Sequence, residues 1–367
     1  MMHRKESKQT FDKPLFIISG IILIFGLIML YSASVAVGLE RFDDSLFYVK
    51  RQLIALIIGA IAGYVAYKID YHAWEQWSLI LLLGSFVLLI LVLIPGFAVS
   101  GQGAQRWLNL GFFAFQPSEL VKLTLILYMS AWLSERGPHI VGSLKGGFVP
   151  FVSVLAVLAI LIILEPDLGT LIIICAIGMV MYFLGGARLS HVLALIIAGS
   201  AGLIFAIKAA PYRMARFTVF INPSLDPQGA GYHIKQALLA VGSGGFTGLG
   251  LGHSRQKFLY LPEVVGDSLF AVIAEEMGFV FSVGLVCLFL WFFWRSIKIS
   301  QRADDSFGRL VAIGIGIWIC TQAFVNIGAM LSILPLTGLT LPLMSYGRSS
   351  LIITMASIGI LLNVSKK

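Results

Sequence analysis

The run Ser268-Leu-Phe-Ala-Val-Ile-Ala-Glu275-Glu276-Met-Gly-Phe-Val-Phe-Ser-Val-Gly-Leu-Val-Cys-Leu-Phe-Leu-Trp-Phe-Phe-Trp294 decides the fold class. It contains only two charged residues and exceeds the roughly 20 apolar residues that a helix needs to cross the core of a bilayer. We therefore predict a transmembrane helix here. The polar segment before this run and the carboxylates within it are candidates for chemistry.

The same signal recurs along the chain of 367 residues, which is 58% hydrophobic and 12% charged with a mean hydropathy of +0.93. Soluble domains carry about 25% charged residues. We predict an all-α polytopic integral membrane protein, with residues 1–367 forming one domain of ten transmembrane helices. The expected spans are about 15–37, 52–69, 77–94, 117–134, 147–164, 169–185, 190–208, 268–294, 308–330 and 341–363.

The distribution of Lys and Arg predicts the orientation of these spans. With a cytoplasmic amino terminus, the inner segments hold 14 basic residues and the short outer loops hold 4. Short loops rich in Lys and Arg stay in the cytoplasm. Both termini are therefore expected on the cytoplasmic side of the membrane, and the basic residues of the inner segments account for most of the net charge of +8. No basic domain stands outside this pattern, so we expect no nucleic-acid binding.

A long polar loop at about 208–267 joins the seventh and eighth predicted spans and faces outward. Residues 232–241 are expected to form a short amphipathic helix at the membrane interface. The glycines of 242–252 lack the Lys-Ser/Thr ending of a phosphate-binding loop, so a nucleotide site is not expected. They suit close approach of the backbone to a ligand or to neighbouring helices instead.

Charged residues at membrane depth are costly and usually face a cavity or a partner. Glu119 and Lys122 are three residues apart in the fourth span, so they share a helix face and can pair with each other. A structural ion pair and a contact with substrate both remain open for them. Arg348, in the tenth span, has no acidic neighbour in the sequence.

Asp267 directly precedes the eighth predicted span and lies at its outer end. One interpretation is a helix cap. The other is a general base, or a metal-ligating carboxylate, in an aqueous cleft. The outer-face cations that accompany it are Arg106, Arg213, Arg216, Arg255 and Lys257.

One carboxylate with several cations, reachable sideways from the bilayer, suits an anionic lipid-linked substrate. For a polyprenyl diphosphate sugar, the cations would stabilise the leaving diphosphate and Asp267 would accept the proton of the acceptor hydroxyl. A second hypothesis is a translocase for lipid-linked precursors, and a third is a scaffold that binds a division enzyme. Functional-looking polar groups concentrate on the outer side, which disfavours the translocase.

At several segments the sequence resembles the shape, elongation, division and sporulation family, the FtsW/RodA peptidoglycan polymerases. The match covers essentially the whole chain. Its motifs are Ala104-Gln-Arg106-Trp107, Gln116-Pro-Ser-Glu119-Leu-Val-Lys122, Glu165-Pro-Asp167-Leu-Gly-Thr170, Pro211-Tyr-Arg213-Met-Ala-Arg216, Asp226-Pro-Gln-Gly-Ala-Gly-Tyr232, Leu261-Pro-Glu263 and Leu341-Pro-Leu-Met-Ser-Tyr346-Gly. The segment Gly250-Leu-Gly-His-Ser254-Arg-Gln-Lys257 is similar to the division branch, FtsW.

The resemblance implies polymerisation of lipid II into glycan strands on the outer face, with undecaprenyl diphosphate as the leaving group. It implies a class B penicillin-binding protein and other membrane proteins of the division machinery as partners. The family's essential aspartate falls on Asp267, its buried acid–base pair on Glu119 and Lys122, and an outer-loop arginine on Arg106. It also implies a divalent cation, Mg or Mn, although nothing in the sequence indicates a dedicated metal site.

Two positions depart from the family pattern. Ser268 follows the aspartate where the family usually has Phe, and Arg348 stands where the family usually has a second glycine. We expect the guanidinium of Arg348 to reach the polar cavity, towards Asp267 or Glu275.

Overall fold

A computed structural model describes residues 11–101, 104–109, 111, 114–208 and 211–366, without the side chains of 99–101, 104–105 and 211–212. Most of the basic amino-terminal tail and residues 102–103 of the second outer loop lie outside this part. The long helices are α1 (Lys13–Phe42), α2 (Phe47–Lys68), α3 (Tyr71–Leu93), α4 (Pro117–Ser134), α6 (Val149–Leu164), α7 (Leu168–Leu184), α8 (Leu189–Lys208), α11 (Leu269–Arg302), α12 (Ser306–Met330) and α13 (Arg348–Val364). Shorter helical segments are α5 (Pro138–Val141), η1 (Leu144–Phe148), α9 (Pro211–Ile221), η2 (Pro223–Leu225) and α10 (Ala230–Ser243).

The polytopic α-helical membrane fold predicted from hydropathy is confirmed. Within the described residues, seven helical segments are long and apolar enough to cross a bilayer, and α7 and α13 are shorter apolar helices. Each of the ten predicted spans overlaps a long helix, but the count of ten crossings stays a prediction. The amphipathic helix expected at 232–241 corresponds to α10.

Two predicted boundaries are wrong. The tenth span was expected from 341, but α13 begins at Arg348, because residues 341–347 are held in a non-helical path by hydrogen bonds. Leu341 N donates to Ser345 Oγ, and Gln52 on α2 donates to Ser345 O and accepts from Gly347 N. Helix α11 continues to Arg302, eight residues past the predicted end. Hydropathy marks only the apolar part of a helix, and the last two turns of α11 are basic and extend beyond that part.

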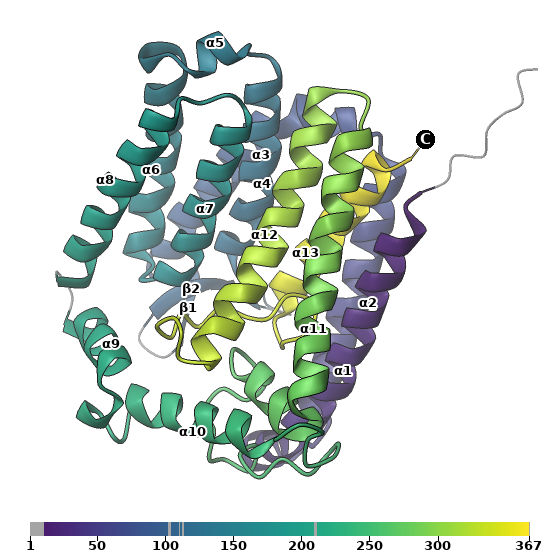
Figure 1. Cartoon of the computed structure of the whole chain (residues 1–367), viewed down its shortest axis with the longest axis vertical. Helices are drawn as coiled ribbons and strands as arrows, with labels where there is room; N and C mark the ends of the chain where they lie inside the picture. The colour runs from purple at the N-terminus through teal and green to yellow at the C-terminus, as the bar shows by residue number, and fades with distance from the viewer. Residues whose placement is uncertain (1–10, 102–103, 110, 112–113, 209–210, 367) are drawn as a thin grey trace, which may run out of the picture.

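The helices form a bundle with two distinct ends (Figure 1). The carboxyl terminus and the start of α1 lie at one end, which we call the terminal end, where Asp12 N donates to Ser365 Oγ at 3.0 Å. Helices α9 and α10 lie at the opposite end, the loop end. The prediction that the termini and the long loop lie on opposite sides of the membrane fits this arrangement.

Small residues bring α2 and α13 into backbone contact. A Cβ added at Gly359 would lie 2.1 Å from Gly63 O, so only glycine fits there. Close approach through small residues is a common way for helices to associate in lipid, where burial of apolar surface provides no driving force. Gly359 and Gly63 therefore hold the chain's last helix in the bundle.

The second loop contains a small antiparallel sheet that the sequence did not predict. Its strands are β1 (Ala98–Gly101), β2 (Ala104–Asn109) and β3 (Ala114–Phe115), in the order β1-β2-β3. Strand β2 carries Arg106 and leads, through β3, into α4. The sheet thus places Arg106 at the loop end, beside the turn between α6 and α7.

Helix α11 is broken at Gly278, where φ is 76° and ψ is −174°. The backbone groups freed by this break bond to the glycine-rich loop that follows α10. Leu249 N and Gly250 N donate to the carbonyls of Glu275 and Glu276, and Phe279 N donates to Gly245 O. A broken membrane helix needs such replacement partners, since lipid offers none. An added Cβ at Gly244 or Gly248 would collide with the carbonyl of Ala274 or Glu276, so these two glycines serve close backbone packing, one of the two roles predicted for the glycines of 242–252.

Candidate active site

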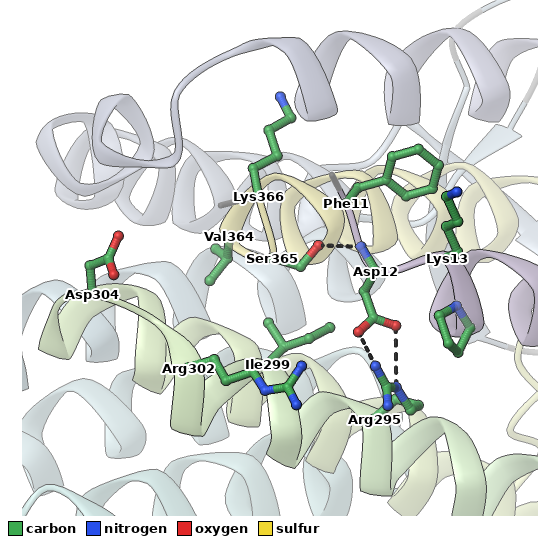
Figure 2. A pocket seen from close by; sticks show the side chains of 11 residues that line it. Phe11, Asp12, Lys13, Arg295, Ile299, Arg302, Asp304, Val364, Ser365 and Lys366 are labelled. Atoms are coloured by element: carbon green, nitrogen blue, oxygen red, sulfur yellow. Dashed lines mark hydrogen bonds and ion pairs between the residues drawn. The ribbon is translucent and has the colours of Figure 1, made fainter. Parts of the chain in front are cut away.

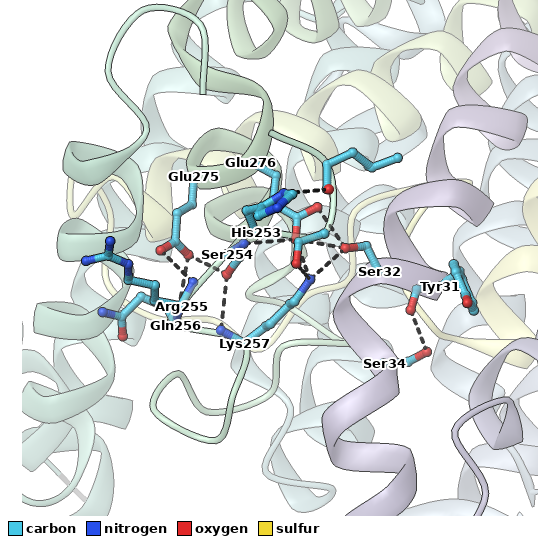
Figure 3. A network of polar contacts seen from close by, with 12 residues as sticks. Tyr31, Ser32, Ser34, His253, Ser254, Arg255, Gln256, Lys257, Glu275 and Glu276 are labelled. Carbon is cyan, nitrogen blue, oxygen red and sulfur yellow. Dashed lines mark hydrogen bonds and ion pairs between the residues drawn. The ribbon is translucent and has the colours of Figure 1, made fainter. Parts of the chain in front are cut away.

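The first half of α11 is tied to the preceding loop by a buried polar network (Figure 3). Lys257 Nζ lies 2.7 Å from Glu276 Oε1 and 3.0 Å from Ser32 Oγ of α1. Ser32 Oγ also donates to the Glu276 carboxylate. Breaking a buried ion pair by removing one partner is strongly destabilising, which gives Lys257 a structural role here.

The neighbouring carboxylate, Glu275, contacts the same loop segment. It accepts hydrogen bonds from Ser254 Oγ and from the backbone amides of Arg255 and Gln256. Consecutive helical side chains point about 100° apart. Both carboxylates nevertheless reach residues 254–257 because this segment wraps around the end of the half-helix. The Arg255 side chain is exposed and points away from Lys257 (Figure 3).

A second buried pair joins α4 to α12. Lys122 Nζ lies 2.7 Å from Glu119 Oε1 and donates to Gln322 Oε1 at 2.8 Å, and it also lies over the ring of Trp318. Both members of the pair are almost completely buried. The pairing predicted from their spacing of three residues is confirmed, whereas contact with substrate remains a prediction.

Two of the predicted cations contact backbone carbonyls of α6, of the turn that follows it and of α8. Arg106 donates to the carbonyls of Glu165 and Pro166. Arg213 donates to Ala206 O and Ile163 O, which anchors α9 to α8 and α6. The structure therefore places both guanidinium groups at one turn of the loop end.

That turn contains a buried carboxyl group which the sequence motif did not explain. Both Glu165 oxygens are buried without a hydrogen-bond partner among the described residues. Burial raises the pKa of Glu165 to about 9, with Asp167 raising it further and Arg106 opposing the shift. Glu165 is therefore protonated at neutral pH. Asp167 instead caps α7, accepting from Thr170 N and Thr170 Oγ1.

Asp267 lies just before α11 at the loop end, and its side chain does not cap the helix. The cap residue is Ser268, which makes no side-chain cap bond. The Asp267 backbone carbonyl accepts a hydrogen bond from Asn326 Nδ2 of α12 at 2.8 Å. The main chain at Asp267 is thus fixed from α12, while its half-buried carboxyl is left for other contacts. The helix-cap interpretation of Asp267 is wrong.

The surroundings of the Asp267 carboxyl raise its pKa to about 7, mainly through burial and then through the negative charge of Glu263. The hydroxyl of Ser268 at 3.4 Å and the charge of Arg216 lower it. Arg216 is exposed. A carboxyl group with a pKa near neutral can exchange a proton at physiological pH, as a general base requires.

Sequence reasoning missed His233, which lies on α10 beside Asp267. Its Nε2 is 2.6 Å from Ser268 Oγ, and this hydroxyl also donates to Pro262 O at 2.7 Å. Burial lowers the pKa of His233 to about 4, so the imidazole is neutral at pH 7. The serine that departs from the family pattern therefore connects the aspartate to a histidine. No local pattern could reveal this, since 35 residues separate the two partners.

Apart from Arg106 and Arg213, which contact backbone carbonyls, the predicted site residues separate into two groups. Asp267, Arg216 and Arg255 retain exposed surface at the loop end, whereas Glu119, Lys122 and Lys257 are enclosed in ion pairs. Arg348 is half-buried at the first residue of α13, and its predicted approach to Asp267 or Glu275 stays a prediction. Among the described residues, no three His, Cys, Asp or Glu side chains form a cluster that could hold a metal ion.

The fold and this site define a multi-pass membrane protein with a polar cluster at one end of its helix bundle. The chain belongs to the FtsW/RodA/SpoVE family of cell cycle proteins, whose model matches residues 13–367. It is 43% identical to the stage V sporulation protein E of Bacillus subtilis (strain 168), over 97% of each chain. It is 40% identical to a probable peptidoglycan glycosyltransferase FtsW of Geobacter sp. (strain M18), again over 97% of each chain.

The chain is also similar to solved structures of related proteins. A chain of a peptidoglycan synthase complex that coordinates polymerization and crosslinking matches with a TM-score of 0.81 and 27% identity, covering 97% of this chain and 98% of that one. The rod shape determining protein RodA of Thermus thermophilus matches with a TM-score of 0.72 and 28% identity, over 97% of each chain. The resemblance inferred from the motifs is confirmed.

Proposed function

We propose that this chain is a peptidoglycan glycosyltransferase that polymerises lipid II into glycan strands on the outer face of the cytoplasmic membrane during cell division, with Asp267 as the general base. The observation that carries the proposal is the Asp267 carboxyl, half-buried at the loop end with a pKa of about 7. The relatives and the matching solved structures support the reaction class.

In the proposed reaction, Asp267 accepts the proton of the acceptor sugar hydroxyl. The hydroxyl oxygen forms a bond to the anomeric carbon of the donor, and the undecaprenyl diphosphate leaves with the bonding electron pair. In this proposal the guanidinium groups of Arg216 and Arg255, which are exposed, neutralise the charge that develops on the diphosphate. Interactions that strengthen as charge develops lower the barrier rather than merely binding the substrate.

The neutral imidazole of His233 supports this role by holding the Ser268 hydroxyl. When Ser268 donates to Pro262 O, His233 Nε2 is the donor to Ser268 Oγ. The serine proton is then directed at Pro262 O rather than at the Asp267 carboxylate, which leaves this carboxylate to accept the proton of the substrate. A divalent cation, Mg or Mn, remains part of the proposal through the family alone, and a chelator tests its contribution.

A class B penicillin-binding protein is the proposed partner that cross-links the new strands, together with other membrane proteins of the division machinery. The matching peptidoglycan synthase complex, which coordinates polymerization with crosslinking, supports such a pairing. The proposed orientation places the loop end outside the cell and both termini in the cytoplasm, as the distribution of basic residues indicates.

The test is polymer formation from lipid II by the full chain co-purified with its penicillin-binding partner, with and without a chelator. Asp267→Asn keeps the size of the side chain but removes the base, and general base catalysis contributes about 10²- to 10⁴-fold. We expect polymer formation to fall by about that factor while the melting temperature stays unchanged. Asp43→Asn is the matched control, because Asp43 is an exposed carboxylate at the loop end of α1.

Asp43 adopts a left-handed conformation, which asparagine tolerates, so this control should retain full activity. Normal polymer formation by Asp267→Asn would remove Asp267 from the mechanism. Absence of polymer from the wild-type complex, in the presence of intact lipid II, would instead reject the glycosyltransferase proposal.

A further inference from the structure

An apolar groove runs between α1, α2 and α13 at the terminal end of the bundle. It encloses about 590 Å³, and its walls are almost wholly apolar, with Leu23, Leu56 and Met355 among them. The hydroxyl of Ser19, which also lines it, is already bonded to Leu15 O. Water gains no hydrogen bonds from such walls, so a hydrocarbon chain is the suitable occupant.

The length of the groove matches one leaflet of a bilayer. Along α2 its lining residues run from Leu56 to Tyr67, which at 1.5 Å per residue is about 16 Å. Half of the hydrocarbon core of a bilayer is about 15 Å. The groove therefore accommodates an acyl chain from the leaflet at the terminal end, and does not extend across the membrane.

Gly20 gives this groove part of its depth. A Cβ added at Gly20 would meet no atom within 4 Å, in contrast to Gly63 and Gly359, where a Cβ would collide with backbone. Gly20 therefore contributes open space rather than a close helix contact, although an isolated glycine is unfavourable in a helix. A larger side chain at this position would occupy the groove without displacing a neighbouring helix.

A polar cavity of about 400 Å³ opens beside the groove, and Phe11 lines both (Figure 2). Its charged lining residues are four cations and two carboxylates, namely Lys13, Arg295, Arg302, Lys366, Asp12 and Asp304. Arg295 is paired with Asp12. Among the described residues, no carboxylate lies within ion-pair distance of Lys13, Arg302 or Lys366, so this cavity has a surplus of positive charge.

We propose that the terminal end of this protein binds one anionic phospholipid, with its headgroup in the polar cavity and an acyl chain in the groove. The adjoining hydrocarbon and cationic compartments match the two halves of such a molecule. Basic pockets between membrane helices are suited to anionic headgroups. The site lies at the terminal end of the bundle, whereas Asp267 lies next to α10 at the loop end, so the proposal does not depend on the proposed reaction.

Native mass spectrometry of the delipidated full chain, titrated with phosphatidylglycerol or with phosphatidylcholine of the same acyl chains, tests this site. Lys13→Gln combined with Arg302→Gln removes two headgroup contacts, and each basic residue near a surface contributes about fivefold to anionic lipid binding. We expect phosphatidylglycerol binding to weaken by about tenfold or more. Lys298→Gln combined with Arg309→Gln is the matched control, since it removes the same charge outside the cavity lining.

Gly20→Leu tests the groove, and Gly84→Leu is its control, because a Cβ at Gly84 on α3 also meets no atom within 4 Å. We expect Gly20→Leu to lose the tightly bound phosphatidylglycerol and Gly84→Leu to retain it, with equal melting temperatures in detergent. Equal affinity for the two lipids, or equal binding by the variants and their controls, would show annular lipid only and overturn the proposal. Competition by inorganic phosphate, with no effect of Gly20→Leu, would show an anion site without an acyl chain, which also contradicts it.

Discussion

The ion pair of Lys257 with Glu276 and the carboxyl of Asp267 lie close together in sequence but differ in their surroundings. Each charged group of the ion pair is buried and has hydrogen-bond partners, including Ser32 from a distant helix. Asp267 is half-buried, belongs to none of the ion pairs of the described residues, and has a pKa of about 7. Charges that neutralise each other stabilise the loop, whereas the Asp267 carboxyl has no such partner and is the base of the proposed reaction.

The largest expected effect comes from removing one member of the buried pair. Lys257→Met leaves the Glu276 carboxylate buried without its cation, which costs about 3–5 kcal/mol for such pairs. We expect a clear fall in the melting temperature of the detergent-solubilised protein, measured by scanning fluorimetry. Lys50→Met is the matched control, since the pair of Lys50 with Asp44 is exposed and should leave the melting temperature unchanged.

A partial recovery in the double variant Lys257→Met with Glu276→Gln would sharpen the comparison, because the buried charge is then gone. An unchanged melting temperature for Lys257→Met alone would contradict the structural role assigned to this lysine.

The glycine-rich loop gives a prediction of intermediate size. Gly248 has a φ of 81°, and a Cβ there would lie 2.1 Å from Glu276 O. Gly248→Ala should therefore destabilise the protein by about 1–3 kcal/mol, the typical cost of a residue held in an unfavourable backbone conformation. Gly242→Ala is the control, since Gly242 is in α10 and a Cβ there meets no atom within 4 Å.

Denaturant titration of the two variants measures the midpoint of unfolding of each, and we expect a lower midpoint for Gly248→Ala than for Gly242→Ala. Equal midpoints for Gly248→Ala and Gly242→Ala would mean that the loop does not pack against α11 as described.

The smallest expected effect is the pH dependence of polymer formation. In the proposed reaction Asp267 acts in its ionised form, and its pKa is raised to about 7, so polymer formation should rise with pH through neutrality. The ionised fraction, and with it the initial rate, increases about tenfold between pH 6 and pH 8. Steady-state rates across this range, with the lipid II concentration held constant, give the pH at which polymer formation is half-maximal.

His233→Ala should shift that midpoint to lower pH. Burial is the main cause of the raised pKa of Asp267, and removal of the imidazole that contacts Ser268 admits water beside the carboxyl. His233 is neutral at pH 7, so the shift comes from solvation rather than from lost charge. An ascending limb near pH 4 in the wild type would contradict the environment assigned to Asp267.

The hydropathy pattern was sufficient for the fold class because each span is a local property of the sequence. It failed at 341–347, where Gln52 of α2 holds the backbone outside a helix. It also missed the strands around Arg106, since their side chains lack a clear alternating pattern. Asp267 was identified from its place before an apolar run, and the pairing of Glu119 with Lys122 from their spacing.

The remaining contacts of the site join residues far apart in the chain. Ser32 is 225 residues from Lys257, and Asn326 is 59 residues from Asp267. Periodicity and spacing carry no information about such pairs, which arise only when the helices pack. The predicted roles of Lys257 and Arg106 in binding substrate were likewise made without knowledge of their partners, Glu276 and the carbonyl of Glu165.

The break at Gly278 divides α11 into two helical segments with different surroundings. The segment Leu269–Met277 is bonded to the glycine-rich loop, while the remainder of the helix continues through the bilayer. Phe246 and Phe279, on the two sides of this junction, are exposed and 6.0 Å apart. The short helical segment Leu269–Met277 therefore connects these exposed rings, at its Gly278 end, with the Asp267 carboxyl just before its other end.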